Sequence, residues 1–116
     1  MVSPTDLKKG SAYYMLTFAD RDWTIPGVEP MIYVGVNVLD SQKAEAETHY
    51  CFQDTVSFSR FGDAIQYKGP ANLADEGASI HSLTARQLST DVFTLEGVIA
   101  EMQAARARAD AKSRET

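Results

Sequence analysis

"MIYVGVNVL", residues 31–39, is the stretch that decides the fold, because it carries the clearest secondary-structure signal in the chain. Its residues alternate between the two faces of an extended chain, and four β-branched side chains share one face: Ile32, Val34, Val36 and Val38. This composition predicts a β-strand. Gly35 has no side chain on the other face, which predicts a bulge, a bend or close packing against the backbone there.

The residues before this strand predict a neighbour for it. "SAYYMLTFA", residues 11–19, is rich in aromatic and apolar side chains and predicts a second strand. "DRDWTIPGVEP", residues 20–30, is a polar connection. Pro26–Gly27 predicts the turn within it, because proline and glycine suit the two central positions of a β-turn. Further upstream, Ser3–Pro4 predicts a single helical turn.

The residues after residue 39 predict three more strands. "THYCFQDTVSF", residues 48–58, alternates over more residues than an ordinary strand contains. Asp54 interrupts the apolar parity, so we expect a strand with a bend or break near Gln53–Asp54. Residues 64–68 and 79–84 predict two shorter strands.

The C-terminal part predicts a helix that starts near Phe93. Its apolar residues recur at helical spacing and predict a face packed on the sheet: Leu95, Val98, Ile99 and Met102. Asp91 or Thr94 can cap the first turn. Gly97 disfavours a helix interior, so we expect the helix to lie close to the sheet there. Residues 106–116 contain no apolar stripe, so we expect them to fray.

Strands come first in this order and the helix comes last, which predicts an α+β fold. We expect a bent, partly barrel-like antiparallel sheet of four to five strands, with the C-terminal helix packed on it. Short connections favour hairpins over parallel crossovers. Residues 1–105 are expected to form a single domain, and residues 106–116 a basic tail.

The composition excludes several classes of protein. A chain of 116 residues with 44% hydrophobic and 23% charged residues can bury a core without disulfides, and its single cysteine rules out a disulfide scaffold. Residues 1–105 carry seven Lys and Arg against fourteen Asp and Glu, which disfavours nucleic acid as a partner. The N-terminus has no apolar segment of the signal-peptide kind, and no apolar run is long enough for a membrane span. We therefore expect a cytoplasmic protein.

His49 and Cys51 are the most conspicuous pair of reactive residue types. A metal site needs three or four converging ligands, and the chain offers only His81 as a further imidazole and no second cysteine. A catalytic Cys–His pair needs hydrogen-bond contact and a third orienting group. The favoured interpretation is a strand that carries a half-buried cysteine and a semi-exposed histidine. No metal or cofactor is expected.

The candidate binding residues lie in two short segments of the chain. Asp20, Asp22 and Trp23 combine acids with the sole tryptophan in a loop, and exposed loop aromatics often anchor partners. Gln53 and Asp54 are polar where the strand pattern requires apolar residues, and such local inconsistencies often mark functional sites. Each has a structural alternative: Trp23 can plug the end of the sheet, and Asp54 can cap a turn. The cations of residues 106–116 can likewise be solvated and complement the end of a helix, or form an arm that binds nucleic acid or a protein partner.

These features favour a small non-catalytic binding or interaction module of the bacterial accessory or immunity type. The expected partner is a protein rather than a small molecule, and a homodimer is possible. The alternative is a small enzyme that uses His49, Cys51, His81 or an acid pair in a pocket at the mouth of the sheet.

Overall fold

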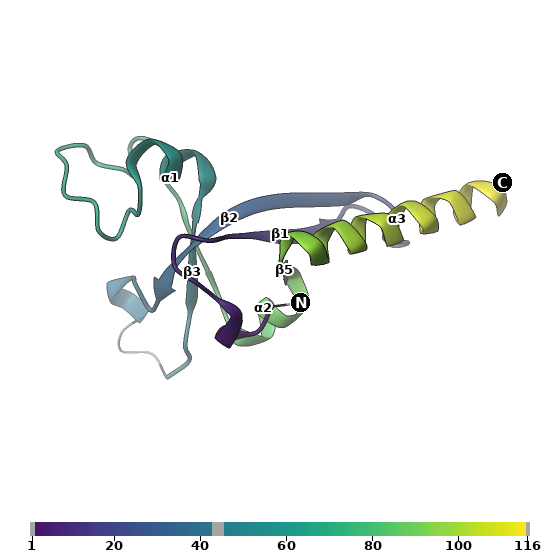
Figure 1. Ribbon diagram of the computed structural model, residues 1–116, viewed down its shortest axis with the longest axis horizontal. Coiled ribbons are helices and arrows are strands. Elements are labelled where there is room, and N and C mark those ends of the chain that lie inside the picture. Colours follow the sequence, from purple (N-terminus) through teal and green to yellow (C-terminus); the bar gives the residue numbers. More distant parts are fainter. Residues whose placement is uncertain (1, 43–45, 116) are drawn as a thin grey trace.

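The structure is a computed structural model that describes residues 2–42 and 46–115, and it has the α+β fold (Figure 1). Five strands form one antiparallel sheet in the order β4-β3-β2-β1-β5. They are β1 (Ala12–Phe18), β2 (Pro26–Val36), β3 (Tyr50–Asp54), β4 (Ile80–Leu83) and β5 (Val92–Phe93). The helices are α1 (Thr55–Phe61), α2 (Ala85–Asp91) and α3 (Leu95–Glu115), with single 3₁₀ turns at Pro4–Asp6 (η1) and Asp40–Gln42 (η2). The sheet is open rather than closed into a barrel, since it ends at β4 and β5.

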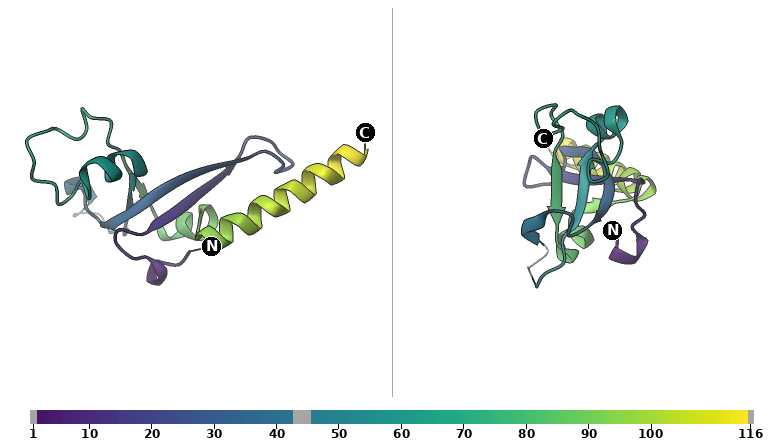
Figure 2. Two further views of the ribbon diagram at one scale, coloured as in Figure 1. Left: turned by 45° about the horizontal axis from the view of Figure 1, so that its top comes forward. Right: turned by 90° about the vertical axis from the view of Figure 1, so that its left-hand side faces the viewer.

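The molecule is elongated. Its radius of gyration is 16.5 Å and its extents are 56 × 31 × 22 Å, whereas a compact domain of this length has a radius of about 13 Å. The β1–β2 hairpin and α3 project together from one end, and two views show them side by side (Figures 1 and 2). We call residues 16–28 and 95–115 the arm, and the remaining elements the body.

Both faces of the sheet are covered in part. One face of the body packs under η1 and α2 and holds the larger core, which consists of Val2, Tyr13, Met31, Tyr33, Phe52, Leu83, Leu88 and Val92. The other face meets α3, where Leu16, Phe93 and Val98 form a smaller core. The apolar contact that attaches α3 to the sheet is therefore small, because only β1, β2 and the short β5 extend to this part of the molecule.

The strand at residues 31–39 is confirmed, but β2 starts earlier than expected and ends at Val36. Pro26 and Gly27 pair with β1, so the turn predicted there is wrong. The chain reverses before them, where the Asp20 carboxylate accepts hydrogen bonds from the backbone N–H groups of Thr24 and Ile25. Asp side chains commonly form such turns. The bulge expected at Gly35 is confirmed by a register shift after Tyr33 and a φ of 136°.

The break expected near Gln53–Asp54 is also confirmed, but the chain beyond it is a helix rather than a strand. The Asp54 carboxylate accepts the Ser57 N–H at 2.8 Å and caps α1. Because the cap supplies a hydrogen-bond acceptor to the first turn, the apolar alternation after it does not continue as a strand. The strand predicted at residues 64–68 is wrong, and these residues form a turn and loop.

The strand predicted at residues 79–84 is confirmed as β4, whereas α2 and β5 were not predicted. Thr84 and Gln87 form a capping box at the start of α2, in which each side chain pairs with the other's backbone N–H. The spacing of these two residues was the available signal for this helix.

The C-terminal helix is confirmed, and Thr94 accepts the Gly97 N–H at its start. The expected buried face is wrong in part: Val98 packs on the sheet, but Leu95, Ile99 and Met102 are exposed. The two strands of the arm are too narrow to cover more than one side of a helix. Helical structure continues to Glu115, and the fraying of residues 106–116 stays a prediction.

Candidate binding site at the free edge of strand β1

A pocket of about 660 Å³ lies along the edge of β1 that faces away from β2. Strand β5 is short and pairs only with Tyr14 and Met15, so no strand among the described residues pairs with residues 16–18 on that side. Residues from four elements and one turn line the pocket: Leu16, Thr17, Phe18, Trp23, Thr90, Asp91, Phe93 and Glu101. The pocket thus combines an open strand edge with side chains from both the arm and the body.

The walls of the pocket are apolar and aromatic. Leu16 and Phe93 are buried at its base. Phe18 and Trp23 stack with ring centroids 5.7 Å apart and an interplanar angle of 17°. Trp23 still exposes 59% of its surface and has a φ of 57°, which is uncommon for a bulky residue. The Asp20 turn therefore holds a largely exposed indole at the end of the pocket.

Two carboxylates line the pocket without a counterion. Asp91 ends α2 and Glu101 lies on the side of α3 that faces β1. Neither forms an ion pair with a lysine or arginine in residues 2–42 and 46–115. Both are partly buried, and the hydroxyl-bearing Thr17 and Thr90 lie in the same lining. The pocket consequently concentrates negative charge next to aromatic rings.

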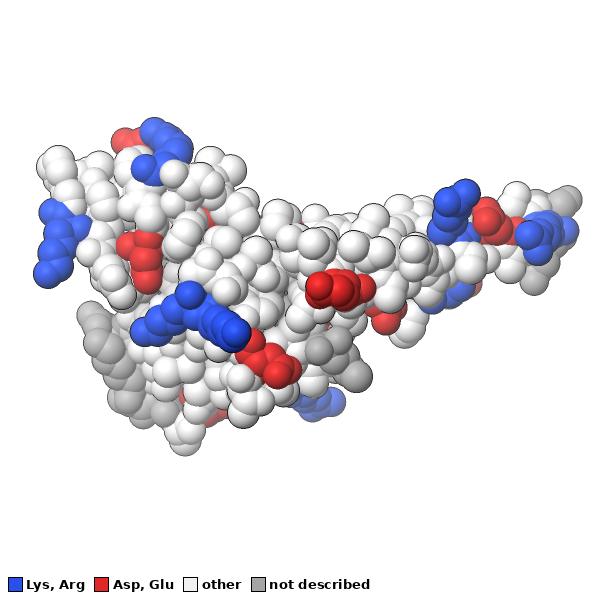
Figure 3. Space-filling model, in the orientation of Figure 1, with Lys and Arg blue, Asp and Glu red and all other residues white. Residues whose placement is uncertain are grey.

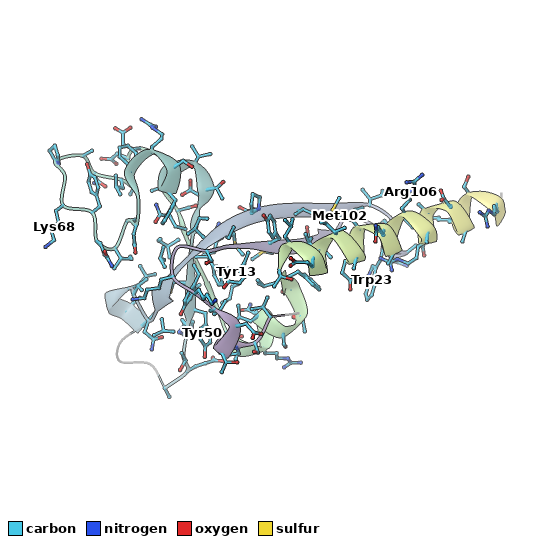
Figure 4. The ribbon with its side chains drawn as sticks, viewed as in Figure 1. Tyr13, Trp23, Tyr50, Lys68, Met102 and Arg106 are labelled. Atoms are coloured by element: carbon cyan, nitrogen blue, oxygen red, sulfur yellow. The ribbon has the colours of Figure 1, made fainter. Side chains whose placement is uncertain are left out.

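Contacts from α3 hold the tip of the hairpin beside the pocket. The Arg108 Nε donates to the Trp23 carbonyl oxygen at 2.8 Å, and its guanidinium lies 5.5 Å from the centre of the Phe18 ring. Lys112 forms an ion pair with Asp22 at 2.6 Å. The hydrogen bond and the charge of Asp22 raise the pKa of Lys112. These contacts fix the position of Trp23, which lies beside α3 at the tip of the hairpin (Figure 4).

The structure separates the predicted binding residues into two groups. Asp20, Asp22 and Trp23 lie at the tip of the hairpin, where Asp20 shapes the turn and Asp22 pairs with α3. The hydrogen bond from the Thr24 hydroxyl, more than those from the backbone, lowers the pKa of Asp20. Only Trp23 of this group lines the pocket. A role in binding stays a prediction for all three.

Gln53 and Asp54 lie in the body and do not meet the tip. Asp54 pairs with Met31 and the tip begins at Pro26, so at least about 17 Å of β2 separates the two groups. Gln53 is fully buried, and its amide donates to Ser57 Oγ and the Gly62 carbonyl while it accepts the Ala64 N–H. Their contacts therefore hold α1 and the following loop on the sheet.

Asp54 shows how its environment stabilises the charged form. Burial opposes ionisation and is the largest single influence, but hydrogen bonds from the Ser57 hydroxyl and from the backbone N–H groups of Ser57 and Ser79 together lower its pKa. The carboxylate thus joins α1 to the residue before β4. This matches the structural alternative for Asp54, which is a cap.

The histidines and the cysteine do not converge on one site. Cys51 is buried, with its Sγ 3.3 Å from Gln42 Oε1 and 3.6 Å from Ser82 Oγ. Cys51 pairs with Ser82 and Phe52 pairs with His81, so His81 points to the opposite face of the sheet from Cys51. The His81 ring instead lies 3.5 Å from the Glu29 carboxylate. In the part of the chain that the structure describes, no three His, Cys, Asp or Glu residues are placed to hold a metal ion.

Of the residues that line the pocket, sequence reasoning named only Trp23 as a binding residue. It missed the aromatic Phe18 and the acids Asp91 and Glu101, as well as Arg108, which holds the hairpin tip. Asp91 was considered only as a helix cap, and Arg108 only as one cation of the tail. No local pattern relates these positions, because they come together only when α3 packs beside β1. The one partial signal for this site was Phe18, an aromatic residue at the end of a predicted strand and next to a loop that contains two acids.

The chain matches no protein-family model, no characterised protein sequence and no solved structure. Among the helices of the described residues, none has both the length and the apolar character that crossing a membrane requires.

Proposed function

We propose that this protein is a non-catalytic interaction module that binds a basic segment of a protein partner in the pocket at the edge of β1. One observation carries the proposal: the carboxylates of Asp91 and Glu101, which have no counterion in the described part of the chain, lie in the same pocket as the stacked rings of Phe18 and Trp23. Carboxylates attract a cation, and aromatic faces bind one when it is partly desolvated. A lysine or arginine side chain combines that charge with an apolar stem.

The open edge of β1 favours an extended peptide over a small molecule. An added strand pairs its backbone with an exposed sheet edge, while alternate side chains enter neighbouring pockets. Residues 16–18 offer such an edge directly beside the carboxylates. In this arrangement the peptide would continue the line of β5, and its basic side chain would reach Glu101 or Asp91. We keep a cytoplasmic location as part of the proposal.

The test uses Trp23 as a reporter, because it is the only tryptophan and lines the pocket. An acetylated peptide that alternates valine and lysine is titrated while the emission of Trp23 is recorded, with a valine–glutamate peptide as the comparison. Saturable binding of the lysine peptide alone, weakening as salt rises, is the expected result. Equal binding of both peptides, or of neither, contradicts the proposal.

Matched variants locate the binding. Asp91→Asn and Glu101→Gln should each weaken the lysine peptide about two- to fivefold, the range for a partly exposed ion pair. Asp75→Asn removes the same charge from an exposed loop of the body and should leave the affinity unchanged. Titration calorimetry checks the affinities independently of Trp23. If Asp75→Asn weakens binding as much as Glu101→Gln, the peptide responds to net charge rather than to the pocket.

A further inference from the structure

Helix α3 has an apolar stripe that the described residues leave exposed. Leu95, Ile99 and Met102 expose 51%, 47% and 44% of their surfaces. Their spacing of four and then three residues places them on one side of the helix. Val98 and Ala105, which are buried, mark a different side that faces the sheet. The stripe is thus separate from the contact that attaches α3 to the body.

The stripe is also separate from the pocket. Figure 4 shows Met102 and Arg106 on the upper side of α3, with Trp23 below the helix. In Figure 3, which has the same orientation, the upper side of the first half of α3 shows no Lys, Arg, Asp or Glu, whereas charged side chains gather towards its far end. Val28, which is exposed and pairs with Leu16 beneath α3, extends the apolar surface onto β2.

We infer that this stripe binds the same stripe of a second copy of the chain, with the two α3 helices antiparallel. The order of charges along α3 favours this orientation. In its first half Glu96 is the acid that does not line the pocket, since Glu101 does. In its second half Arg106 continues the stripe, whereas Arg108 and Lys112 contact the hairpin. An antiparallel pair can place Glu96 of each helix near Arg106 of the other, whereas a parallel pair places each of these charges beside its own copy.

The stripe defines a register for this pair. When Ile99 of one helix lies against Met102 of the other, Leu95 lies against Arg106. Arg106 then adjoins Glu96 of the second copy, which follows Leu95. The same contacts form twice, as a two-fold axis requires. This register accounts for Arg106, a charged residue that follows Met102 on the same side of the helix.

The first experiment measures the mass of the protein by sedimentation equilibrium across a range of concentrations. The wild-type chain should show a reversible monomer–dimer equilibrium that weakens as salt rises. Ile99→Glu and Met102→Lys each place a charge at the centre of the interface and should weaken association at least tenfold. Both residues are exposed in the single chain, so circular dichroism should be unchanged. A wild-type chain that stays monomeric at every concentration overturns the inference.

A charge swap tests the orientation. Glu96→Arg alone and Arg106→Glu alone should each weaken the dimer, because each places like charges together. The double variant should restore it, because the opposite charges meet again. In a parallel pair neither position faces the other, so the double variant should not recover, and that result overturns the antiparallel register.

Disulfide trapping provides a second test of the register. A chain with Ile99→Cys mixed with a chain with Met102→Cys should form mainly the mixed disulfide under mild oxidation. The native Cys51 is buried and does not compete readily. Preferential linkage of Ile99→Cys to itself indicates a parallel pair.

Two variants separate the dimer from the proposed peptide binding. Glu101→Gln should leave the dimer intact and Ile99→Glu should leave peptide binding intact, so failure of either proposal can be distinguished from failure of the other.

Discussion

The body and the arm differ in which side chains they leave exposed. The comparison is between the region around β3 and α1 in the body and the hairpin with α3 in the arm. In the body, polar side chains are hydrogen-bonded within the fold: the buried Gln53 makes three hydrogen bonds, and the half-buried Asp54 joins a helix cap to the residue before β4. In the arm, apolar side chains such as Ile99 and Met102 remain exposed, and Glu101 has no counterion among the residues that the structure describes. Groups that the fold already uses contribute to stability, whereas groups that it leaves unsatisfied are available for binding.

The largest expected contrast is between buried Leu88 in the body and exposed Ile99 in the arm. Leu88→Ala should lower the free energy of unfolding by about 2–5 kcal/mol, because it leaves a cavity in the larger core. Ile99→Ala should change it by no more than about 0.5 kcal/mol in the monomer. Urea denaturation at low protein concentration measures both. Similar losses for the two variants would mean that α3 is packed through a different face.

The next contrast concerns polar burial. Gln53→Leu keeps the volume but leaves the Ala64 N–H and the Gly62 carbonyl without their partner, so it should cost about 1–3 kcal/mol. Gln66→Leu makes the same change at an exposed position of the adjoining loop and should have little effect on stability. Thermal denaturation compares the two variants. A neutral Gln53→Leu would show that water replaces these hydrogen bonds.

The Asp54 carboxylate should make the stability of the body depend on pH. Asp54→Ala removes a cap and should cost about 1–2 kcal/mol near neutral pH. The pKa of Asp54 is lowered in the folded state, so its stabilisation is complete above the unfolded value near 3.9 and is lost as pH falls through the lower folded value.

The measurement is therefore urea denaturation of wild type and Asp54→Ala at neutral pH and at about pH 2.5, below the reference value. The difference between the two proteins should shrink in acid. Asp75→Ala, at an exposed loop position, should show a small difference that does not vary in this way. A gap for Asp54→Ala that stays constant with pH would assign its effect to packing.

The smallest expected effect is a gain in the arm. A Cβ at Gly97 would lie 3.4 Å from Phe93 Cδ2 and Thr94 Oγ1, which is ordinary contact, so Gly97→Ala should stabilise the helix by up to about 1 kcal/mol. Gly77→Ala should instead destabilise the protein, because Gly77 has a φ of 89°. If global unfolding does not register Gly97→Ala while helix content rises, the arm unfolds separately from the body.

The sequence by itself determined the local elements of this protein, because their causes are local. The β-branched alternation of residues 31–39, the glycine that permits a bulge at Gly35 and the aspartate that ends β3 each act over a few residues. Thr84 and Gln87 belong to the same kind of signal, although the ambiguous apolar spacing around them concealed α2. The turn before β2 was predicted at Pro26–Gly27, but the chain turns earlier. It does so because the Asp20 carboxylate accepts backbone hydrogen bonds that stabilise a turn before Pro26.

Only the tertiary structure decided which side of α3 is buried and which residues form the pocket. Helical spacing groups Leu95, Val98, Ile99 and Met102 together, but a two-stranded arm can cover only the side that carries Val98 and Ala105. The carboxylates of Asp91 and Glu101 meet Trp23 because α2, α3 and the hairpin converge at the short β5. No local sequence pattern predicts this grouping of side chains, because it depends on the packing of elements that are far apart along the chain.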